Sequence, residues 1–484
     1  MLKAPVPIAI PVALSCALSF PLSFACAQTT EDAAAKAPAS RTPALRDAVQ
    51  KAIAWIGRQA VPVEGHEDAV TFPGTAEQPD RRSAIVYGGG AGVLIFLENA
   101  AKVLGDEHVR ALADRTANGL LATARKDEHG RTWVDPKMRE GAAALYVGDA
   151  GVGAAFLARA RLRGDAAALL VATEVGDALL ARAQRDGDAL GWDHQVEVIY
   201  GTAGTALFLL ELAAAVPDGA RFRDGALAAG RHLIASSKSD DKEPGRRYWR
   251  WALAGNATYT GFSHGTAGVA YALLRIGLEC KDDACVQAAK DGAEWLQALA
   301  VRDGELVHWP VAPKSSTSMG GWCHGPPGTA RLFLLLYGAT KEQRWLDTAL
   351  GSARWVMAQA GPADAKIPPA FPPSFCCGVA GAVDFFCDLQ RATGDAQYGA
   401  FAARAADYLL AKAEADGDGI KWANGVNDQK AAAHLHSVDL MLGASGEAFA
   451  LLRVLTLGDA ADPVVGLPDR RLAPAPAPVT TTGK

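Results

Sequence analysis

The sequence lacks both a basic stripe and an internal linker. Its 48 Lys and Arg residues are scattered and are outnumbered by 53 Asp and Glu residues, which gives a formal net charge of −5 and argues against a nucleic acid as partner. Repeated motifs follow one another from about residue 45 to about residue 457 without a break. Half of the 484 residues are hydrophobic, which is enough for one continuous core. Although this length normally suggests two or three domains, we therefore expect one repeat domain over residues 45–470.

The N-terminal region lacks an uninterrupted apolar run. Residues 8–24 are apolar, but two prolines interrupt them and the run is too short for a secure membrane span. Lys3 ahead of this run and the small residues around a cleavage position after Ala27 are typical of a secretory signal peptide. We predict that residues 1–27 are a signal peptide and that the protein is exported to the periplasm or secreted. Cys26 would suit a lipoprotein anchor, but the bulky aromatic residue ahead of it makes a poor lipoprotein signal.

Two further segments lack the repeat. Residues 28–44 contain mainly Ala, Thr, Pro and charged residues, and residues 471–484 contain an alternating Ala-Pro run. Such compositions are typical of chain without a packed core. We expect a disordered spacer and a flexible tail.

A Gly-x-x-Gly motif recurs seven times, and each copy opens a run of apolar helix-forming residues. The first glycines of the seven copies are Gly89, Gly148, Gly201, Gly265, Gly325, Gly378 and Gly443. The steps between them are 59, 53, 64, 60, 53 and 65 residues. Self-similarity at such a period is the signature of a repeat architecture.

Each repeat has the same internal order. In the second, residues 108–126 have apolar residues at helical spacing and charges on one face, which predicts an outer helix. A polar loop and the motif follow, and then residues 152–160, whose apolar character on every side predicts a buried inner helix. Seven such pairs predict an all-α fold, an α,α-toroid of seven helical hairpins whose inner helices begin at the glycine motifs. All seven motif loops should then form one ring around the central opening.

A tryptophan recurs in the loop ahead of five motifs. These residues are Trp133, Trp192, Trp251, Trp309 and Trp422. We interpret them as aromatic side chains that pin the loops, without a role in chemistry.

The repeat provides a register in which reactive residues can be compared. The position directly before each leading glycine holds, in chain order, Gly88, Val147, Tyr200, His264, His324, Cys377 and Leu442. The position before that one holds Tyr87, Tyr146, Ile199, Ser263, Cys323, Cys376 and Met441. Three cysteines and two histidines thus occupy equivalent places in three consecutive repeats, and the predicted ring brings them within reach of one another.

Three thiols from two adjacent repeats predict a metal site. Zinc is the usual ion for cysteine ligands, so we expect Cys323, Cys376 and Cys377 to bind one Zn²⁺. Three ligands leave a fourth position open, as in catalytic sites, whereas His324 as a fourth ligand would close a structural site. Cys376 and Cys377 could instead form a vicinal disulfide. Because a metal deprotonates a thiol that it coordinates, an open position indicates a thiol substrate that is activated as a nucleophile.

The other cysteines suggest simpler roles. Six cysteines would remain after cleavage behind Ala27, and an even number in an oxidising compartment favours disulfides. Cys280 and Cys285, on either side of a short polar turn, form a plausible pair. Cys387 falls within a predicted inner helix and should be a small buried apolar residue.

Three of the motifs resemble segments of the lanthionine synthetase C-like (LanC-like) family. Residues 261–268 look like its His-Gly-x-Ala-Gly segment, and residues 321–328 look like its Trp-Cys-x-Gly-x-Pro-Gly segment. Residues 374–381 lie where the family usually has Cys-His-Gly, and this chain has Cys-Cys-Gly. The resemblance covers essentially the whole mature chain. It implies a toroid that holds zinc and adds peptide cysteine thiols to dehydroalanine or dehydrobutyrine, which forms thioether rings.

The resemblance also implies roles for single residues. Cys323 and Cys376 match the family's two cysteine zinc ligands, and Cys377 replaces the common histidine ligand. A Cys-Cys-Gly version with three thiolates occurs in a subset of the bifunctional synthetases, so zinc binding is preserved. His264 matches the histidine thought to protonate the enolate after addition. Glu197 aligns with an acidic residue implicated near the substrate.

Two positions depart from the family pattern. His324 stands where the family has Tyr, and Met319 stands where it has Arg. His324 is therefore a further candidate for proton transfer, or else a rim residue without a role. The lost Arg and the signal segment favour an alternative function, a secreted toroid that binds a peptide or thiol without forming rings. A carbohydrate-active toroid would need a pair of carboxylates at the opening, and Glu197 alone meets that requirement in its repeat. We expect a monomer that acts on a peptide or a small thiol.

Overall fold

The computed structural model describes residues 41–472, except residues 136, 139, 241–242, 363–365, 368–370 and 425–434. The predicted signal peptide, nearly all of the spacer and the tail beyond Leu472 lie outside the described residues. The first helix begins at Thr42, which is slightly before the predicted start of the domain at residue 45.

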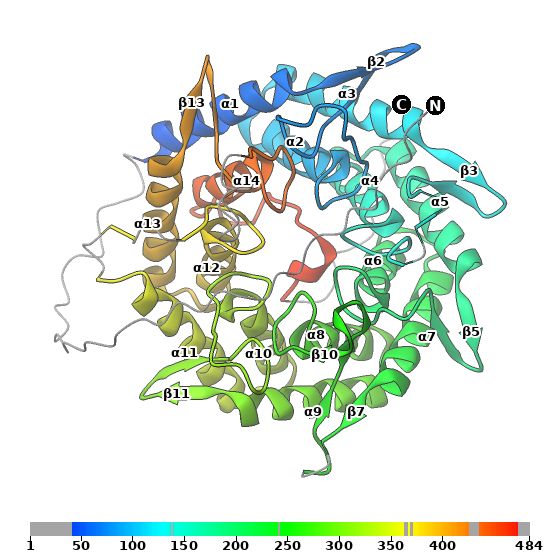
Figure 1. Ribbon diagram of the computed structural model, residues 1–484, viewed down its shortest axis with the longest axis vertical. Helices are drawn as coiled ribbons and strands as arrows, with labels where there is room; N and C mark the ends of the chain where they lie inside the picture. Colours follow the sequence, from blue (N-terminus) through cyan, green and yellow to red (C-terminus); the bar gives the residue numbers. More distant parts are fainter. Residues whose placement is uncertain are drawn as a thin grey trace.

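Fourteen α-helices in the described residues form two concentric rings around a central opening (Figure 1). The inner ring consists of α2 (Gly90–Leu104), α4 (Asp149–Arg163), α6 (Thr202–Ala215), α8 (Thr266–Cys280), α10 (Pro326–Thr340), α12 (Val379–Thr393) and α14 (Ala444–Leu455). The outer ring consists of α1 (Thr42–Arg58), α3 (Glu107–Thr123), α5 (Ala166–Arg182), α7 (Ala220–Ser236), α9 (Asp283–Leu299), α11 (Gln343–Gln359) and α13 (Ala396–Lys412). The predicted α,α-toroid is confirmed.

The inner helices begin where the motifs predicted. In all seven, the first glycine of the motif is the N-cap residue, with an extended backbone. Apolar residues predominate on these helices and form one continuous core with the inward faces of the outer helices. No helix in the described residues has both the length and the apolar character that a membrane crossing requires.

The hairpins are offset by one helix from the predicted repeat. We expected each inner helix to pair with the outer helix ahead of it, but it packs mainly against the outer helix that follows, as α4 does with α5. The connection between these two helices is tight: Gly164 adopts a left-handed conformation (φ 68°), and Asp165 caps the next helix. The last inner helix, α14, pairs with the first outer helix, α1. The two ends of the repeat array thereby close the ring.

Short two-stranded hairpins, which the sequence analysis did not predict, follow the outer helices at the rim (Figure 1). They are β1–β2 (Val61–Val63, His66–Thr71), β3–β4 (Arg125–Asp127, Gly130–Thr132), β5–β6 (Gln184–Asp186, Ala189–Gly191), β7–β8 (Lys238–Ser239, Arg247–Tyr248), β11–β12 (Val301–Asp303, Leu306–His308) and β13–β14 (Glu414–Asp416, Gly419–Lys421). An Asp-Gly step, whose glycine has a positive φ, turns three of them, at Gly187, Gly304 and Gly417. The fourth loop contains a further pair, β9 (Arg250–Trp251) and β10 (Ala257–Thr258), joined through the 3₁₀ helix η1 (Ala252–Ala254).

The C-terminal segment occupies the centre of the toroid in projection (Figure 1). Its 3₁₀ helix η2 (Pro468–Arg470) places Asp469 where the Tyr146 hydroxyl donates a 2.8 Å hydrogen bond to it. Arg471, which we assigned to the flexible tail, instead forms an ion pair with the buried Glu211. The folded chain therefore continues past the predicted domain end at residue 470.

Candidate metal centre

The motif loops form a hydrogen-bonded ring at the end of the barrel where the inner helices begin. Five hydrogen bonds join equivalent residues of neighbouring repeats. In each, the backbone N–H of the residue two positions before the motif glycine donates to the carbonyl of the equivalent residue in the next repeat. These bonds are Tyr87 to Tyr146, Tyr146 to Ile199, Ser263 to Cys323, Cys323 to Cys376, and Cys376 to Met441. Between the third and fourth repeats, Val198 donates to Ser263 instead. We call this arrangement the motif ring, and it confirms the predicted convergence of the loops.

The second glycine of each motif allows the ring to close tightly. At Gly328, an added Cβ would lie 2.1 Å from the carbonyl oxygen of Trp322 and 2.6 Å from Cβ of Phe262. Only glycine fits this approach between a helix start and its neighbouring loops.

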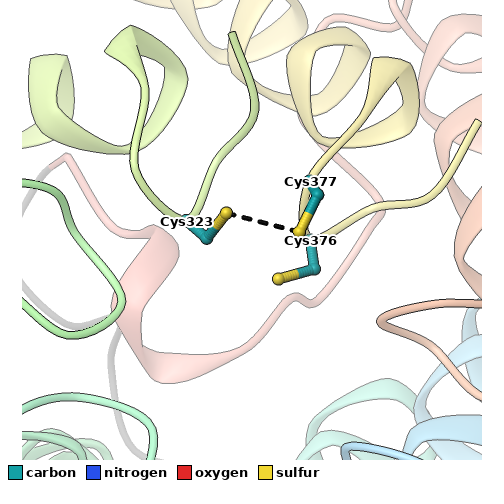
Figure 2. Close-up of side chains that lie close together, drawn as sticks. All are labelled: Cys323, Cys376 and Cys377. Atoms are coloured by element: carbon teal, nitrogen blue, oxygen red, sulfur yellow. Dashed lines mark hydrogen bonds between the residues drawn. The ribbon is translucent and has the colours of Figure 1, made fainter. Parts of the chain in front are cut away.

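Three thiols meet in the motif ring, and we call them the thiol cluster: Cys323, Cys376 and Cys377. Cys323 comes from the loop before α10, and the other two come from the loop before α12 (Figure 2). Their sulfur atoms all lie within 4.8 Å of one another, and Sγ of Cys323 is 3.4 Å from Sγ of Cys377. Cys323 and Cys376 are buried, and Cys377 is partly exposed.

The geometry of the thiol cluster suits a metal ion. In a tetrahedral site with metal–sulfur bonds of about 2.3 Å, the sulfurs lie roughly 3.8 Å apart, which is close to the observed spacing. All three thiols are free, so the vicinal disulfide is absent. Within the described residues, no fourth His, Cys, Asp or Glu joins the cluster. The cluster could therefore bind a metal ion and leave one coordination position open.

The three thiols share their protons unequally. Hydrogen bonds from Cys323 and Cys376 lower the pKa of Cys377 well below its usual value, although burial opposes this. The hydrogen bonds of Cys323 to the other two thiols raise the pKa of Cys323 well above its usual value, and burial adds to the effect. Of the three thiols, Cys377 is therefore the one whose thiolate form the cluster favours.

Tyr87 is a residue of this site that the sequence analysis missed. Its hydroxyl forms a hydrogen bond with the Cys376 thiol, and burial, followed by the charges of Cys376 and Cys377, raises the pKa of Tyr87 well above its usual value. The alignment of the repeats could have identified Tyr87, because it occupies the same position in the first repeat as Cys376 does in the sixth.

His264 is held by three side chains in the neighbouring loops. Its imidazole stacks on the indole of Trp251, with ring centroids 3.8 Å apart and planes 7° apart, and the Tyr200 ring lies 6.1 Å away. Nδ1 of His264 lies 3.2 Å from Oε2 of Glu197, without the alignment of a hydrogen bond. Glu197 is buried, and its carboxylate accepts the backbone N–H groups of Ile199 and Tyr200 at 2.6 and 2.8 Å.

His324 directly follows Cys323 of the thiol cluster and lies near His264. Its ring is 5.9 Å from that of His264 and 5.3 Å from that of Tyr259. Burial, and then the proximity of His264, lower the pKa of His324 to about 4, so its imidazole is neutral near pH 7. Met319, at the position of the family Arg, packs partly buried against the hydrophobic core. The residues predicted for the site thus lie close together in the motif ring.

The structure also shows the outcome for the other cysteines. Cys280 and Cys285 are not paired: the Cys280 thiol faces the carbonyl of Arg223, whereas Cys285 points from α9 into the core beside Gly230. Cys387 is fully buried, as expected.

The tryptophan pattern also needs one correction. Four of the five indole N–H groups donate to a carbonyl near the end of the preceding outer helix, as loop-pinning residues should: those of Trp133, Trp192, Trp309 and Trp422. In the fourth repeat the equivalent bond comes from Trp249, to Leu233. Trp251 therefore does not pin its loop.

The closed ring of helical hairpins and the thiol cluster define an α,α-toroid with a candidate metal site at its central opening. Residues 82–465, most of the chain, match the family described as lanthionine synthetase C-like protein, and the chain belongs to this family.

Individual relatives are distant. The solved structure of nisin cyclase is similar with a TM-score of 0.54 at 14% identity, covering 76% of this chain and 90% of that one, which shows the shared fold. Glutathione S-transferase LANCL1 of Danio rerio is 25% identical over 134 residues, 27% of this chain and 31% of that protein. The match to this relative spans less than a third of its length.

Proposed function

We propose that this protein is a zinc-dependent thioether-forming enzyme, which adds a substrate thiol to a dehydroalanine or dehydrobutyrine residue of a peptide. The observation that supports this most is the position of the thiol cluster in the same ring of loops that presents His264. A metal-activated thiol and a positioned acid are the two groups that such an addition needs.

Cys323, Cys376 and Cys377 would hold the zinc ion, because three thiolates form a soft donor set that suits zinc. When bound, zinc would supply a Lewis acid at the open position, which favours the thiolate form of a substrate thiol. Tyr87 would orient Cys376 through its hydroxyl. Three thiolates would leave the metal less electron-withdrawing than two thiolates and an imidazole, and would keep a substrate thiolate more nucleophilic.

The remaining steps belong to the protein's side chains and the substrate. The thiolate sulfur forms a bond to the β-carbon of the dehydroamino acid, and the carbon–carbon π electrons move into an enolate. His264, in its protonated form, donates a proton to the α-carbon, and the proton lost by the substrate thiol restores the imidazolium. Glu197, beside Nδ1, keeps the ring oriented. The net reaction joins a thiol to a double bond without loss or gain of atoms.

Two sources of the thiol fit this chemistry. The family name indicates a peptide with its own cysteine, whereas the name of the Danio rerio relative indicates glutathione as a thiol. We infer from residues 1–27 that the protein acts after export, where it would meet its substrates outside the cytoplasm. A toroid that binds peptides or thiols without catalysis is the second candidate, supported by Met319 in place of the family Arg.

The test is mass spectrometry of a dehydrated peptide with one free cysteine, after alkylation of unreacted thiols. The wild-type protein should convert the peptide to a form that no longer accepts the alkylating reagent. His264→Ala should keep zinc and fold, but should slow conversion by about 10²–10⁴-fold, the usual contribution of a positioned acid. If the wild type closes no ring and transfers no added thiol, the binding function becomes the better account.

A further inference from the structure

The fourth repeat contains a segment that has no counterpart in the other described loops. Its pinning tryptophan is Trp249, and β9, η1 and β10 follow directly behind it. This additional hairpin places a second tryptophan, Trp251, two residues further along the chain. The segment thus brings an aromatic side chain to His264 that the repeat pattern alone would not provide.

The additional hairpin has its own small apolar cluster, separate from the toroid core. It consists of Trp251, Tyr259 and Val311, with Tyr200 and Met319 packed against it. Trp251 is only 4% exposed, and its ring centroid lies 5.9 Å from that of Tyr259 and 6.4 Å from that of Tyr200. The indole is therefore fixed by packing on several sides.

The rings of Trp251 and His264 are in a parallel stacking arrangement. The two rings are nearly parallel, and their separation corresponds to van der Waals contact over the whole imidazole face. The indole N–H has no hydrogen-bond partner in the described part of the chain, although a buried donor without a partner is unfavourable by about 1–3 kcal/mol. Hydrogen bonding therefore does not explain the position of this tryptophan. Its position is explained by packing against His264 and the neighbouring side chains.

We propose that Trp251 is a positioning residue for His264. This inference rests on the proposed function. The indole face fixes the plane of the imidazole, and Glu197 limits rotation within that plane by its place beside Nδ1. With both constraints, His264 presents its proton from one direction, so the enolate is protonated on one face.

The variants separate stacking from packing. Trp251→Ala removes the stack, Trp251→Phe keeps an aromatic face, and Val311→Ala weakens the same apolar cluster without touching His264. Each is tested with a dehydrated peptide that carries one free cysteine. The readouts are kcat, KM and the diastereomer ratio of the thioether amino acid after hydrolysis. A fourth readout, independent of activity, is the NMR resonance of the His264 imidazole, which ring currents of a stacked indole displace; the signal is assigned with His264→Gln.

We expect Trp251→Ala to lower kcat by about 10- to 100-fold with little change in KM, since displacement of a catalytic group by about 1 Å has costs of that size. Its product should contain both diastereomers, because water then protonates the enolate from either side. Trp251→Phe should restore the single diastereomer, and Val311→Ala should keep it. Equal diastereomer ratios and an equal imidazole resonance in Trp251→Ala and Val311→Ala would overturn the proposal.

A failure of the proposed function is distinguishable from a failure of this inference. If the wild type forms no thioether, the imidazole resonance alone decides the role of Trp251. A displaced resonance that is lost in Trp251→Ala and kept in Val311→Ala supports it, and an undisplaced resonance in the wild type overturns it.

Discussion

Oε2 of Glu197 lies 3.2 Å from Nδ1 of His264, although the two residues belong to different repeats. The same carboxylate accepts the N–H groups of Ile199 and Tyr200, so it fixes its own loop while it faces the imidazole of the next. A single buried side chain thereby couples the shape of one motif loop to the orientation of the proposed acid.

This coupling predicts a non-additive pair of substitutions. Glu197→Gln removes the carboxylate beside Nδ1 and should lower kcat by about 10-fold or more, because the imidazole is then less well oriented. In a His264→Gln background the same change should have little further effect, since residues that act through one another do not add. The measurement is kcat for the wild type, both single variants and the double variant. Additive losses would show that Glu197 acts independently of His264.

The closeness of the motif ring predicts opposite effects for two glycines on one helix. Gly328→Ala would force a methyl group against the Trp322 carbonyl, so we expect a loss of about 1–3 kcal/mol in the free energy of unfolding. At Gly338, near the other end of α10, the nearest atom to an added Cβ is 4.0 Å away. Gly338→Ala should therefore raise the free energy of unfolding by about 0.5–1 kcal/mol, since alanine favours a helix more than glycine does. Thermal denaturation of both variants checks this, and a Gly328→Ala protein as stable as Gly338→Ala would contradict it.

Glu447 predicts a dependence of stability on pH. It is fully buried on α14, and neither carboxylate oxygen has a hydrogen-bond partner in the described residues. Burial raises its pKa from 4.5 to about 8, so the folded protein keeps a proton that the unfolded chain loses at lower pH. The resulting stabilisation is complete below about pH 4.5, declines by roughly 1 kcal/mol per pH unit and is gone above about pH 8.

Glu447→Gln carries no titratable group at this position and should lack that decline. Urea unfolding of both proteins at about pH 5.5 and about pH 8 measures the difference. The wild type should lose more stability than the variant between the two conditions. The same loss in both proteins would mean that Glu447 is already ionised in the folded state.

The toroid could be predicted because the glycine motifs recur at a regular spacing along the chain. Each motif glycine lies at a helix start that packs against neighbouring backbone. Because only glycine fits there, the positions of these helix starts can be recognised from the sequence. The convergence of Cys323, Cys376 and Cys377 followed from the same register, because equivalent positions of a closed ring face one opening. The hydrogen bonds from Cys323 to Cys376 and from Cys376 to Met441 give this inference its physical basis.

Other features depend on contacts that the register does not encode. The pairing of α14 with α1 joins the two ends of the array, which no local pattern indicates. The sequence analysis assigns a loop-pinning role to Trp251, whereas Trp249, two residues earlier, makes the equivalent hydrogen bond. Spacing alone cannot show which of these two tryptophans makes that bond. The proximity of Glu197 to His264 depends on the conformations of two side chains that belong to different motif loops. These are properties of packing, and they appear only in three dimensions.

The central claim is that the thiol cluster holds one zinc ion, and the zinc content of protein purified without added metal tests it most directly. The wild type and Cys280→Ser, which alters a thiol far from the cluster in sequence, should each contain about one zinc per chain. Cys376→Ser/Cys377→Ser should contain almost none, because only Cys323 would remain as a thiolate ligand. A full equivalent of zinc in that double variant would contradict the assignment.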